Sequence, residues 1–140
     1  MTPVKYIASK PPITASPDIT IKEAAEIMVE KKIGFLVLVD GEEIYGVVSE
    51  RDIIESVAAG ISPMEKVSVI AKRMVIKIDA DATVKEAASL MRKYGIRHLV
   101  VTQKGRLYGV LSIRDLVRER EIFKSISEFP QPELFTAPAD

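Results

Sequence analysis

Apolar residues recur at helical spacing in two segments of the chain. After Thr20 they occupy positions i, i+3, i+4 and i+7, namely Ile21, Ala24, Ala25 and Met28. After Thr83 the same positions hold Val84, Ala87, Ala88 and Met91. This spacing puts each set of side chains on one face of a helix, so the pattern predicts two amphipathic helices with one buried stripe each.

Both predicted helices carry start signals. Thr20 is followed three residues later by Glu23, and Thr83 is followed by Glu86. In such a capping box the threonine hydroxyl accepts from an unpaired helix N–H, and the glutamate reaches back to the N-cap amide. Gly95 is a suitable C-terminal stop for the second of these helices.

Short β-branched runs surround these helices and predict six strands. In the first half they are Pro12–Ser16, Phe35–Val39 and Ile44–Val48, and in the second half Met74–Ile78, His98–Thr102 and Leu107–Leu111. Polar turns that contain glycine, at 40–43 and 103–106, join the last two strands of each half into a hairpin. A further helix follows each hairpin, at Glu50–Ala58 and Ile113–Ser125, so each half has the order strand–helix–strand–strand–helix.

The two halves are copies of one another. Residues 18–54 align without a gap on residues 81–117, and 16 of the 37 aligned pairs are identical. Amphipathic segments alone do not reproduce polar identities in register, such as the serine and aspartate shared by the two hairpin ends. The chain is therefore an internal duplication, which implies an approximate two-fold axis and two equivalent clefts between the copies.

The expected fold class is α+β: two β-α-β-β-α repeats related by a pseudo-two-fold axis, with their sheets packed face to face and the helices outside. Three strands and two helices bury too little apolar surface alone, whereas two copies share a core. We expect repeat one over residues 1–63, with an N-terminal arm at Met1–Pro11 that packs on the second repeat. Repeat two is expected over 64–126, followed by a proline-containing tail at 127–140 that we expect to be flexible.

Composition narrows the range of functions. The 140 residues are 47% hydrophobic and 29% charged, and 20 basic residues balance 20 acidic ones. Zero net charge argues against a protein held to nucleic acid by phosphate contacts. The absence of cysteine excludes disulfide frameworks, thiol nucleophiles and zinc ribbons. No apolar run reaches the length of a membrane span and the N-terminus lacks a signal-peptide core, so the expected location is cytoplasmic.

No catalytic pattern stands out in the sequence. The chain has one histidine, and it lacks the H-E-x-x-H, G-x-S-x-G and G-x-x-x-x-G-K-[ST] motifs. Turns and helix caps explain the paired carboxylates Asp18, Asp81, Glu23 and Glu86, and no clustered spacing indicates a metal site. We therefore expect a protein without enzymatic activity, catalytic cofactor or bound metal.

A longer motif ends each repeat. Residues 45–52 read YGVVSERD and residues 108–115 read YGVLSIRD, so a glycine, two apolar residues and S-x-x-D recur with the same upstream spacing. From Pro3 to Arg120 the sequence resembles a tandem pair of CBS domains, called a Bateman module. The resemblance implies dimers of such pairs and adenosine-nucleotide binding in the clefts between repeats, where the serine and aspartate of the motif contact phosphate and ribose.

The residue types of this motif suit a nucleotide. At a helix N-terminus the serine hydroxyl can donate to phosphate, and the arginine can add charge-assisted contacts. An aspartate carboxylate can accept from both hydroxyls of a ribose diol. S-x-x-D is also a capping motif, and this alternative stays open beside the ligand role. The candidate residues are Ser49, Arg51 and Asp52 in repeat one and Ser112, Arg114 and Asp115 in repeat two.

The positions that open the middle strand differ between the repeats. Repeat two has Arg97 and His98 where repeat one has Gly34 and Phe35. By the resemblance, Arg97 and His98 reach the phosphates of a nucleotide held by the motif aspartate of repeat one, which makes that cleft the better phosphate site. Gly34 and Phe35 then line the more apolar cleft of the other aspartate. The alternative is that His98 is an ordinary half-buried strand residue and Arg97 is solvated.

The resemblance implies a regulatory module. We expect AMP, ADP or ATP as the ligand, with S-adenosylmethionine less favoured because Arg51, Arg97 and Arg114 suit phosphates. Thr14 and Lys77, on the first strand of each repeat, are further candidate contacts. A homodimer whose clefts close on the ligand would signal to a protein partner in trans, with no nucleic acid or membrane involved. The alternative is an interaction scaffold with degenerate clefts whose role is dimerisation.

Overall fold

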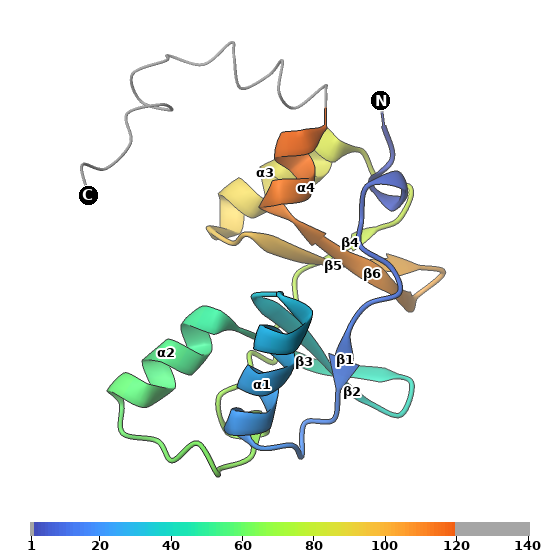
Figure 1. Cartoon of the computed structure of the whole chain (residues 1–140). Helices are drawn as coiled ribbons and strands as arrows, with labels where there is room; N and C mark the ends of the chain where they lie inside the picture. Colours follow the sequence, from blue (N-terminus) through green and yellow to red (C-terminus); the bar gives the residue numbers. More distant parts are fainter. Residues whose placement is uncertain (1, 120–140) are drawn as a thin grey trace, which may run out of the picture.

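The computed structural model describes residues 2–119 and has one lobe for each repeat (Figure 1). Repeat one contains β1 (Thr14–Ala15), α1 (Ile21–Lys31), β2 (Phe35–Asp40), β3 (Glu43–Ser49) and α2 (Glu50–Ala58). Repeat two contains β4 (Lys77–Asp79), α3 (Val84–Tyr94), β5 (His98–Gln103), β6 (Arg106–Ser112) and α4 (Ile113–Arg118). Short 3-10 helices lie at Val4–Tyr6 (η1) and Val67–Val69 (η2). The predicted element order is confirmed in both repeats.

Each repeat forms a three-stranded mixed sheet, in the order β1-β2-β3 or β4-β5-β6. The first strand of each sheet runs parallel to the second, and the last two form an antiparallel hairpin. The first strands are shorter than predicted, because β1 pairs over two residues and β4 over three. The last helix is predicted to continue to Ser125 but ends at Arg118, because Glu119 is extended. Residues 120–125 of the predicted helix and the tail at 127–140 lie outside the described residues.

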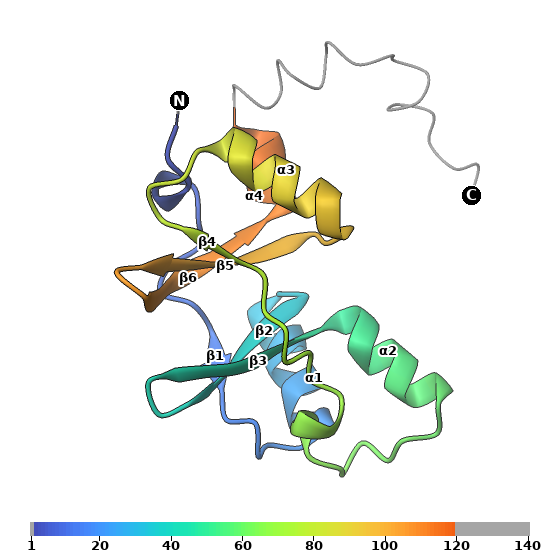
Figure 2. The same cartoon turned by 180° about the vertical axis from the view of Figure 1, so that it is seen from behind.

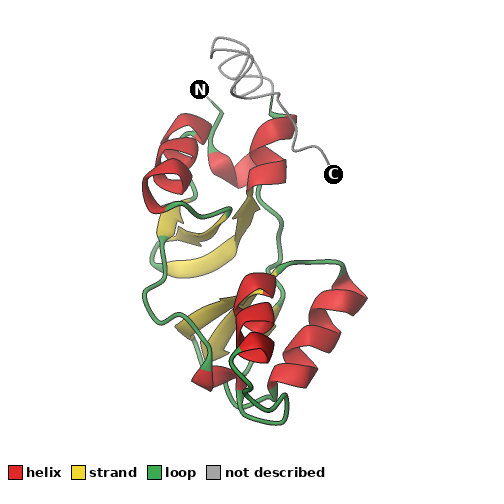
Figure 3. Ribbon diagram, turned by 90° about the vertical axis from the view of Figure 1, so that its left-hand side faces the viewer, coloured by secondary structure: helices red, strands yellow, loops and turns green. Residues whose placement is uncertain are grey.

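The two sheets pack face to face and the helices cover their outer faces (Figures 1 and 2). Successive residues of β2 face opposite sides of the sheet, and both sides are buried. Leu36 and Leu38 point into the core under the helices of repeat one, whereas Val37 packs with Val47 and Val100 in a cluster drawn from both sheets. The side view in Figure 3 shows the same layered arrangement of helices and sheets. The expected fold class is confirmed.

The chain exchanges segments between the two cores. Val4 from the N-terminal arm is fully buried in the core of repeat two, and Lys5 binds Asp81 at 2.7 Å. Val67 from the linker is fully buried in the core of repeat one. The arm therefore packs on the second repeat as predicted, and the two cores do not follow the expected boundary between residues 63 and 64.

Capping boxes start both amphipathic helices, as the sequence predicts. Thr20 Oγ1 accepts from the Glu23 amide at 3.0 Å, and Glu23 Oε1 accepts from the Thr20 amide at 2.9 Å. Thr83 and Glu86 repeat the arrangement. The helices end on left-handed residues, Gly95 in repeat two and, at the equivalent position, Lys32 with φ of 56° in repeat one.

The repeated glycine of the hairpin allows a linker to cross the sheet edge. A Cβ at Gly46 would lie 2.6 Å from the carbonyl oxygen of Lys72, and one at Gly109 would lie 2.5 Å from that of Ser9. Ser9 pairs with Val110, and Lys72 with the corresponding valine of β3, as isolated β-bridges. These glycines therefore serve close backbone approach by the chain's own linkers.

Candidate functional site

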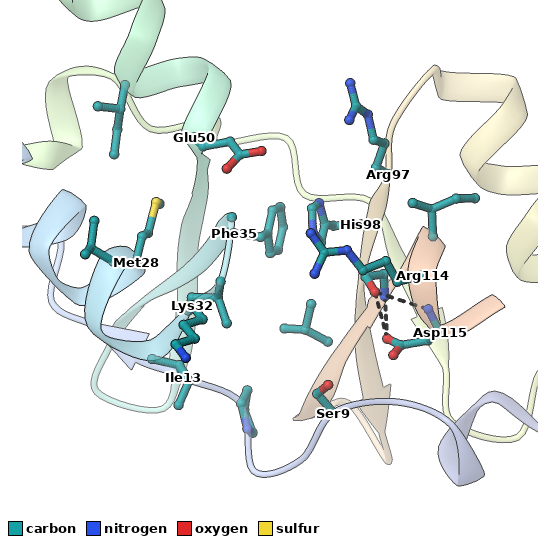
Figure 4. Close-up of a pocket in the computed structure, with 18 of the residues that line it drawn as sticks. Ser9, Ile13, Met28, Lys32, Phe35, Glu50, Arg97, His98, Arg114 and Asp115 are labelled. Atoms are coloured by element: carbon teal, nitrogen blue, oxygen red, sulfur yellow. Dashed lines mark hydrogen bonds between the residues drawn. The ribbon is translucent and has the colours of Figure 1, made fainter. Parts of the chain in front are cut away.

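A cavity of about 730 Å³ opens between the two repeats (Figure 4). Its walls come from α1, the starts of β2 and β5, the first turns of α2 and α4, and the segment at 9–13 that precedes β1. It brings together seven of the twelve residues predicted from the sequence: Gly34, Phe35, Arg97, His98, Ser112, Arg114 and Asp115.

The motif of repeat two both caps a helix and faces the cavity. Asp115 Oδ2 accepts from the amide of Ser112 at 2.8 Å and from its hydroxyl at 3.1 Å, and Ser112 Oγ accepts from the Asp115 amide at 3.3 Å. The capping alternative is thus confirmed. The capping bonds use only one carboxylate oxygen, and within residues 2–119 no hydrogen bond or ion pair engages Oδ1 of Asp115. That oxygen remains available to a hydroxyl donor in the cavity.

The motif of repeat one has the same cap in a different setting. Asp52 Oδ2 accepts from the Ser49 amide at 2.8 Å, and its Oδ1 lies 3.8 Å from Lys72 Nζ. Asp52 is only 8% exposed, whereas Arg51 is exposed and lies 3.8 Å from Glu55. None of Ser49, Arg51 and Asp52 lines the cavity of Asp115. A basic side chain of the linker therefore already compensates the Asp52 carboxylate.

Phe35 and His98, which hold equivalent positions in the two repeats, meet between the sheets. Their rings stack with centroids 4.6 Å apart and planes inclined by 10°. Because the starts of β2 and β5 meet here, Arg97 and His98 line the same cavity as Asp115, beside Gly34. The expectation that Arg97 and His98 make the Asp52 cleft the better phosphate site is therefore wrong. The basic residues and the available carboxylate oxygen share one cavity.

The cavity carries an excess of positive charge. Its described lining includes two carboxylates, Glu50 and Asp115, and four permanently basic side chains, Lys32, Arg97, Arg114 and Arg118. No ion pair within residues 2–119 joins these cations to those carboxylates. The basic groups can therefore bind an anionic ligand without first breaking a salt bridge.

His98 is poised to respond to charge in the cavity. Burial lowers the pKa of its imidazole below the ordinary value, and the nearby guanidinium groups of Arg97 and Arg114 act in the same direction. The carboxylates of Glu50 and Asp115 raise the pKa and oppose the shift. A phosphate placed near the ring would likewise favour the protonated form.

Two predicted contacts lie elsewhere. Ile13, and not Thr14, lines the cavity, because consecutive strand residues face opposite sides of a sheet. Lys77 lines a separate cavity of about 310 Å³ beside the hairpin turns, with Glu42, Glu43 and others. Thr14 and Lys77 therefore do not line the cavity of Asp115, and their role as ligand contacts stays a prediction.

Sequence reasoning missed several lining residues. Lys32 stands where repeat two has Gly95, and Glu50 stands where repeat two has Ile113. At both positions a charged residue in repeat one aligns with an uncharged residue in repeat two. Alignment of the two repeats could therefore have identified Lys32 and Glu50 as candidate site residues. Arg118 lies beyond the matched motif and gives no such signal.

Comparison with known proteins identifies the family. The family model for the CBS domain matches residues 4–59 and 67–122. A solved CBS domain protein from Pyrobaculum aerophilum, complexed with AMP, is 34% identical, covers 91% of this chain and all of its own, and superposes with a TM-score of 0.83. A solved CBS domain pair in complex with 5′-methylthioadenosine and S-adenosyl-L-methionine is 33% identical over 90% of this chain and 98% of its own, with a TM-score of 0.80.

The chain is also similar to a curated protein that has no assigned function. A 17.7 kDa protein from Acidianus ambivalens is 36% identical over 121 residues, which are 84% of this chain and 72% of the relative. The chain belongs to the CBS domain family and contains two copies of that domain. In the part of the chain that the structure describes, no helix combines the length and the apolar character needed to cross a membrane.

Proposed function

We propose that the protein is a regulatory module that binds an adenosine nucleotide in the cavity between its two CBS domains. One observation carries the proposal: the available Oδ1 of Asp115 and the basic side chains of Arg97 and Arg114 line one cavity without ion pairs among them. A ribose diol donates to the carboxylate, and a phosphate accepts from the guanidinium groups. The AMP complex of the Pyrobaculum relative supports the ligand class.

Binding would change how the two repeats are held together. The cavity is lined by residues of both repeats and of the linker at 9–13, so a bound ligand would contact both repeats at once. Such a ligand shifts the arrangement only as far as it binds one arrangement more tightly than another. The signal would then pass to a protein partner through the outer helices.

Exposed apolar residues support a homodimer formed through these helices. Ile54 and Val57 on α2 are 67% and 70% exposed, and Val117, which aligns with Ile54, is 45% exposed on α4. A second copy that covers both helices would remove this apolar surface from water. Light scattering of Ile54→Glu should then report a monomer, whereas Glu55→Gln on the same helix should remain dimeric.

Calorimetric titration with AMP, ADP, ATP and S-adenosylmethionine tests the proposal. We expect AMP to bind, and Asp115→Asn to weaken its affinity about tenfold or more through loss of a charge-assisted hydrogen bond. Asp52→Asn is the matched control, because it disturbs the equivalent helix cap but lies outside this cavity. Loss of binding in Asp52→Asn and not in Asp115→Asn would place the ligand elsewhere.

The same titrations separate the alternatives. Binding of S-adenosylmethionine without any phosphorylated ligand would favour a site that recognises the adenosine group alone. If no adenosine compound binds, the cavity is degenerate and the interaction-scaffold function is favoured. A thermal-shift assay gives an independent check, because a ligand at one hundred times its Kd stabilises the fold by about 2.7 kcal/mol.

A further inference from the structure

The two repeats differ in charge where they meet at the edge of the cavity. Repeat one has Gly34 beside Glu50, and repeat two has Arg97 beside Ile113 at the equivalent positions. A backbone hydrogen bond holds the two positions of each repeat together. The Glu50 amide donates to the Gly34 carbonyl at 2.9 Å, and the Ile113 amide donates to the Arg97 carbonyl at 2.8 Å. One repeat therefore contributes a carboxylate to this edge, and the other contributes a guanidinium group.

The glycine makes room for the carboxylate. A Cβ at Gly34 would lie 2.9 Å from Glu50 Oε2 and 3.2 Å from Oε1, so the Glu50 side chain folds over the position where any other residue would project. Figure 4 shows Glu50 and Arg97 on the same side of the Phe35–His98 stack, each beside the ring from its own repeat. Within residues 2–119 the Glu50 carboxylate makes no hydrogen bond or ion pair. Its negative charge therefore faces a cavity lining in which four basic side chains, Lys32, Arg97, Arg114 and Arg118, outnumber the two carboxylates, Glu50 and Asp115.

We propose that Glu50 is a specificity-determining residue that makes the cavity prefer a nucleoside monophosphate over the corresponding di- and triphosphate. The inference rests on the proposed function. Arg114 precedes Asp115 in the sequence, and its side chain extends towards Phe35 and His98 (Figure 4). If Asp115 binds the ribose, the first phosphate would bind beside this guanidinium group. Further phosphates would occupy the edge that Arg97 shares with Glu50.

Charge balance gives the reason for the preference. Each added phosphate brings about one further negative charge, and at this edge the Glu50 carboxylate offsets the attraction of Arg97. Like charges a few ångströms apart near a protein surface repel strongly enough to change an affinity about tenfold. A monophosphate bound beside Arg114 avoids most of this repulsion. Glu50 therefore lowers the affinity for a di- or triphosphate more than the affinity for a monophosphate.

The test compares affinities for AMP, ADP and ATP in the wild-type protein and in Glu50→Gln, without divalent cations. Wild type should bind AMP more tightly than ATP, and Glu50→Gln should reduce that preference about tenfold, chiefly by tightening ATP binding. Glu55→Gln is the matched control, because Glu55 lies on the same helix, pairs with Arg51 and does not line the cavity. It should leave the preference unchanged.

The outcomes distinguish this inference from the proposed function. If AMP binds and the ratio of AMP to ATP affinity is the same in wild type and Glu50→Gln, the role of Glu50 is overturned and the nucleotide site stands. If Glu50→Gln instead weakens only S-adenosylmethionine, Glu50 recognises a cationic ligand and the inference is also overturned. If wild type binds no adenosine compound, the proposed function itself fails. Matching melting temperatures of the two variants would exclude misfolding as the cause of any difference.

Discussion

The imidazole of His98 lies flat against the ring of Phe35, with the ring centroids 4.6 Å apart. The two residues hold equivalent positions in the duplicated halves, so the stack marks the pseudo-two-fold axis between the sheets. It also forms part of the wall of the cavity that contains Asp115. A change in the charge of His98 therefore acts on the repeat interface and on the candidate site at once.

The first prediction concerns pH. Burial lowers the pKa of His98 in the folded protein, so the unfolded chain binds more protons than the folded chain once the pH falls below about 6.5. The free energy of unfolding should then decrease as the pH falls from 7 through the folded pKa. His98→Phe keeps an aromatic ring against Phe35 but cannot take up a proton, and it should lose this part of the acid sensitivity.

Urea unfolding at several pH values between 7.5 and 5 measures the effect. The difference in unfolding free energy between wild type and His98→Phe should change with pH in this range and level off above it. A constant difference across the range would show that His98 titrates alike in the folded and unfolded chains.

The second prediction concerns the hairpin glycines. Gly46→Ala and Gly109→Ala should each lower stability by about 2 kcal/mol, because the new Cβ would meet a linker carbonyl at 2.6 or 2.5 Å and the backbone must shift. Gly34→Ala is the control, since the three atoms nearest to its Cβ would all belong to the end of the flexible Glu50 side chain. Thermal or urea unfolding of the three variants should show a small change for Gly34→Ala. Equal losses in all three would point to a general sensitivity of these strands to alanine.

Much of the fold follows from local patterns that the duplication repeats. The helix stripes, the Thr-x-x-Glu caps and the hairpins depend on neighbours within a few residues, and the structure confirms them. The partner of Gly46 was not predictable in this way, because Lys72 lies 26 residues further along the chain. Nor does an apolar pattern say which of two cores a valine enters, so the sequence predicts that the N-terminal arm packs on repeat two but not that Val67 is buried in repeat one.

The candidate site shows the same limit. The motif residues and the unusual pair at 97–98 were found from sequence, but their grouping depends on how two sheets meet. Phe35 and His98 stack on one another, and this contact brings Arg97 into the cavity of Asp115. Comparison of the two repeats position by position would have found Lys32 and Glu50, since both change the charge of the matched residue.

The third prediction separates helix capping from ligand binding. Thr83→Ala and Ser112→Ala each remove an N-cap hydroxyl, so each should lower the free energy of unfolding by about 1 kcal/mol. Only Ser112 lines the cavity, so only Ser112→Ala should also weaken AMP binding. Unfolding curves and calorimetric titrations of both variants provide the comparison. Equal losses of affinity would mean that reduced stability, and not contact with the nucleotide, explains the effect.

The fourth prediction concerns the segments exchanged between the repeats. Val4 is buried in the core of repeat two and Val67 in the core of repeat one, and both side chains are 0% exposed to solvent. Val4→Ala and Val67→Ala should therefore each lower the free energy of unfolding by about 2 kcal/mol, through lost apolar burial and the small cavity left behind. Tyr6, in the same arm, is 72% exposed, so Tyr6→Ala should change stability by no more than about 0.5 kcal/mol. An equally small change in the free energy of unfolding for Val4→Ala and Tyr6→Ala, measured by urea unfolding, would contradict this prediction. It would mean that burial of Val4 does not stabilise repeat two.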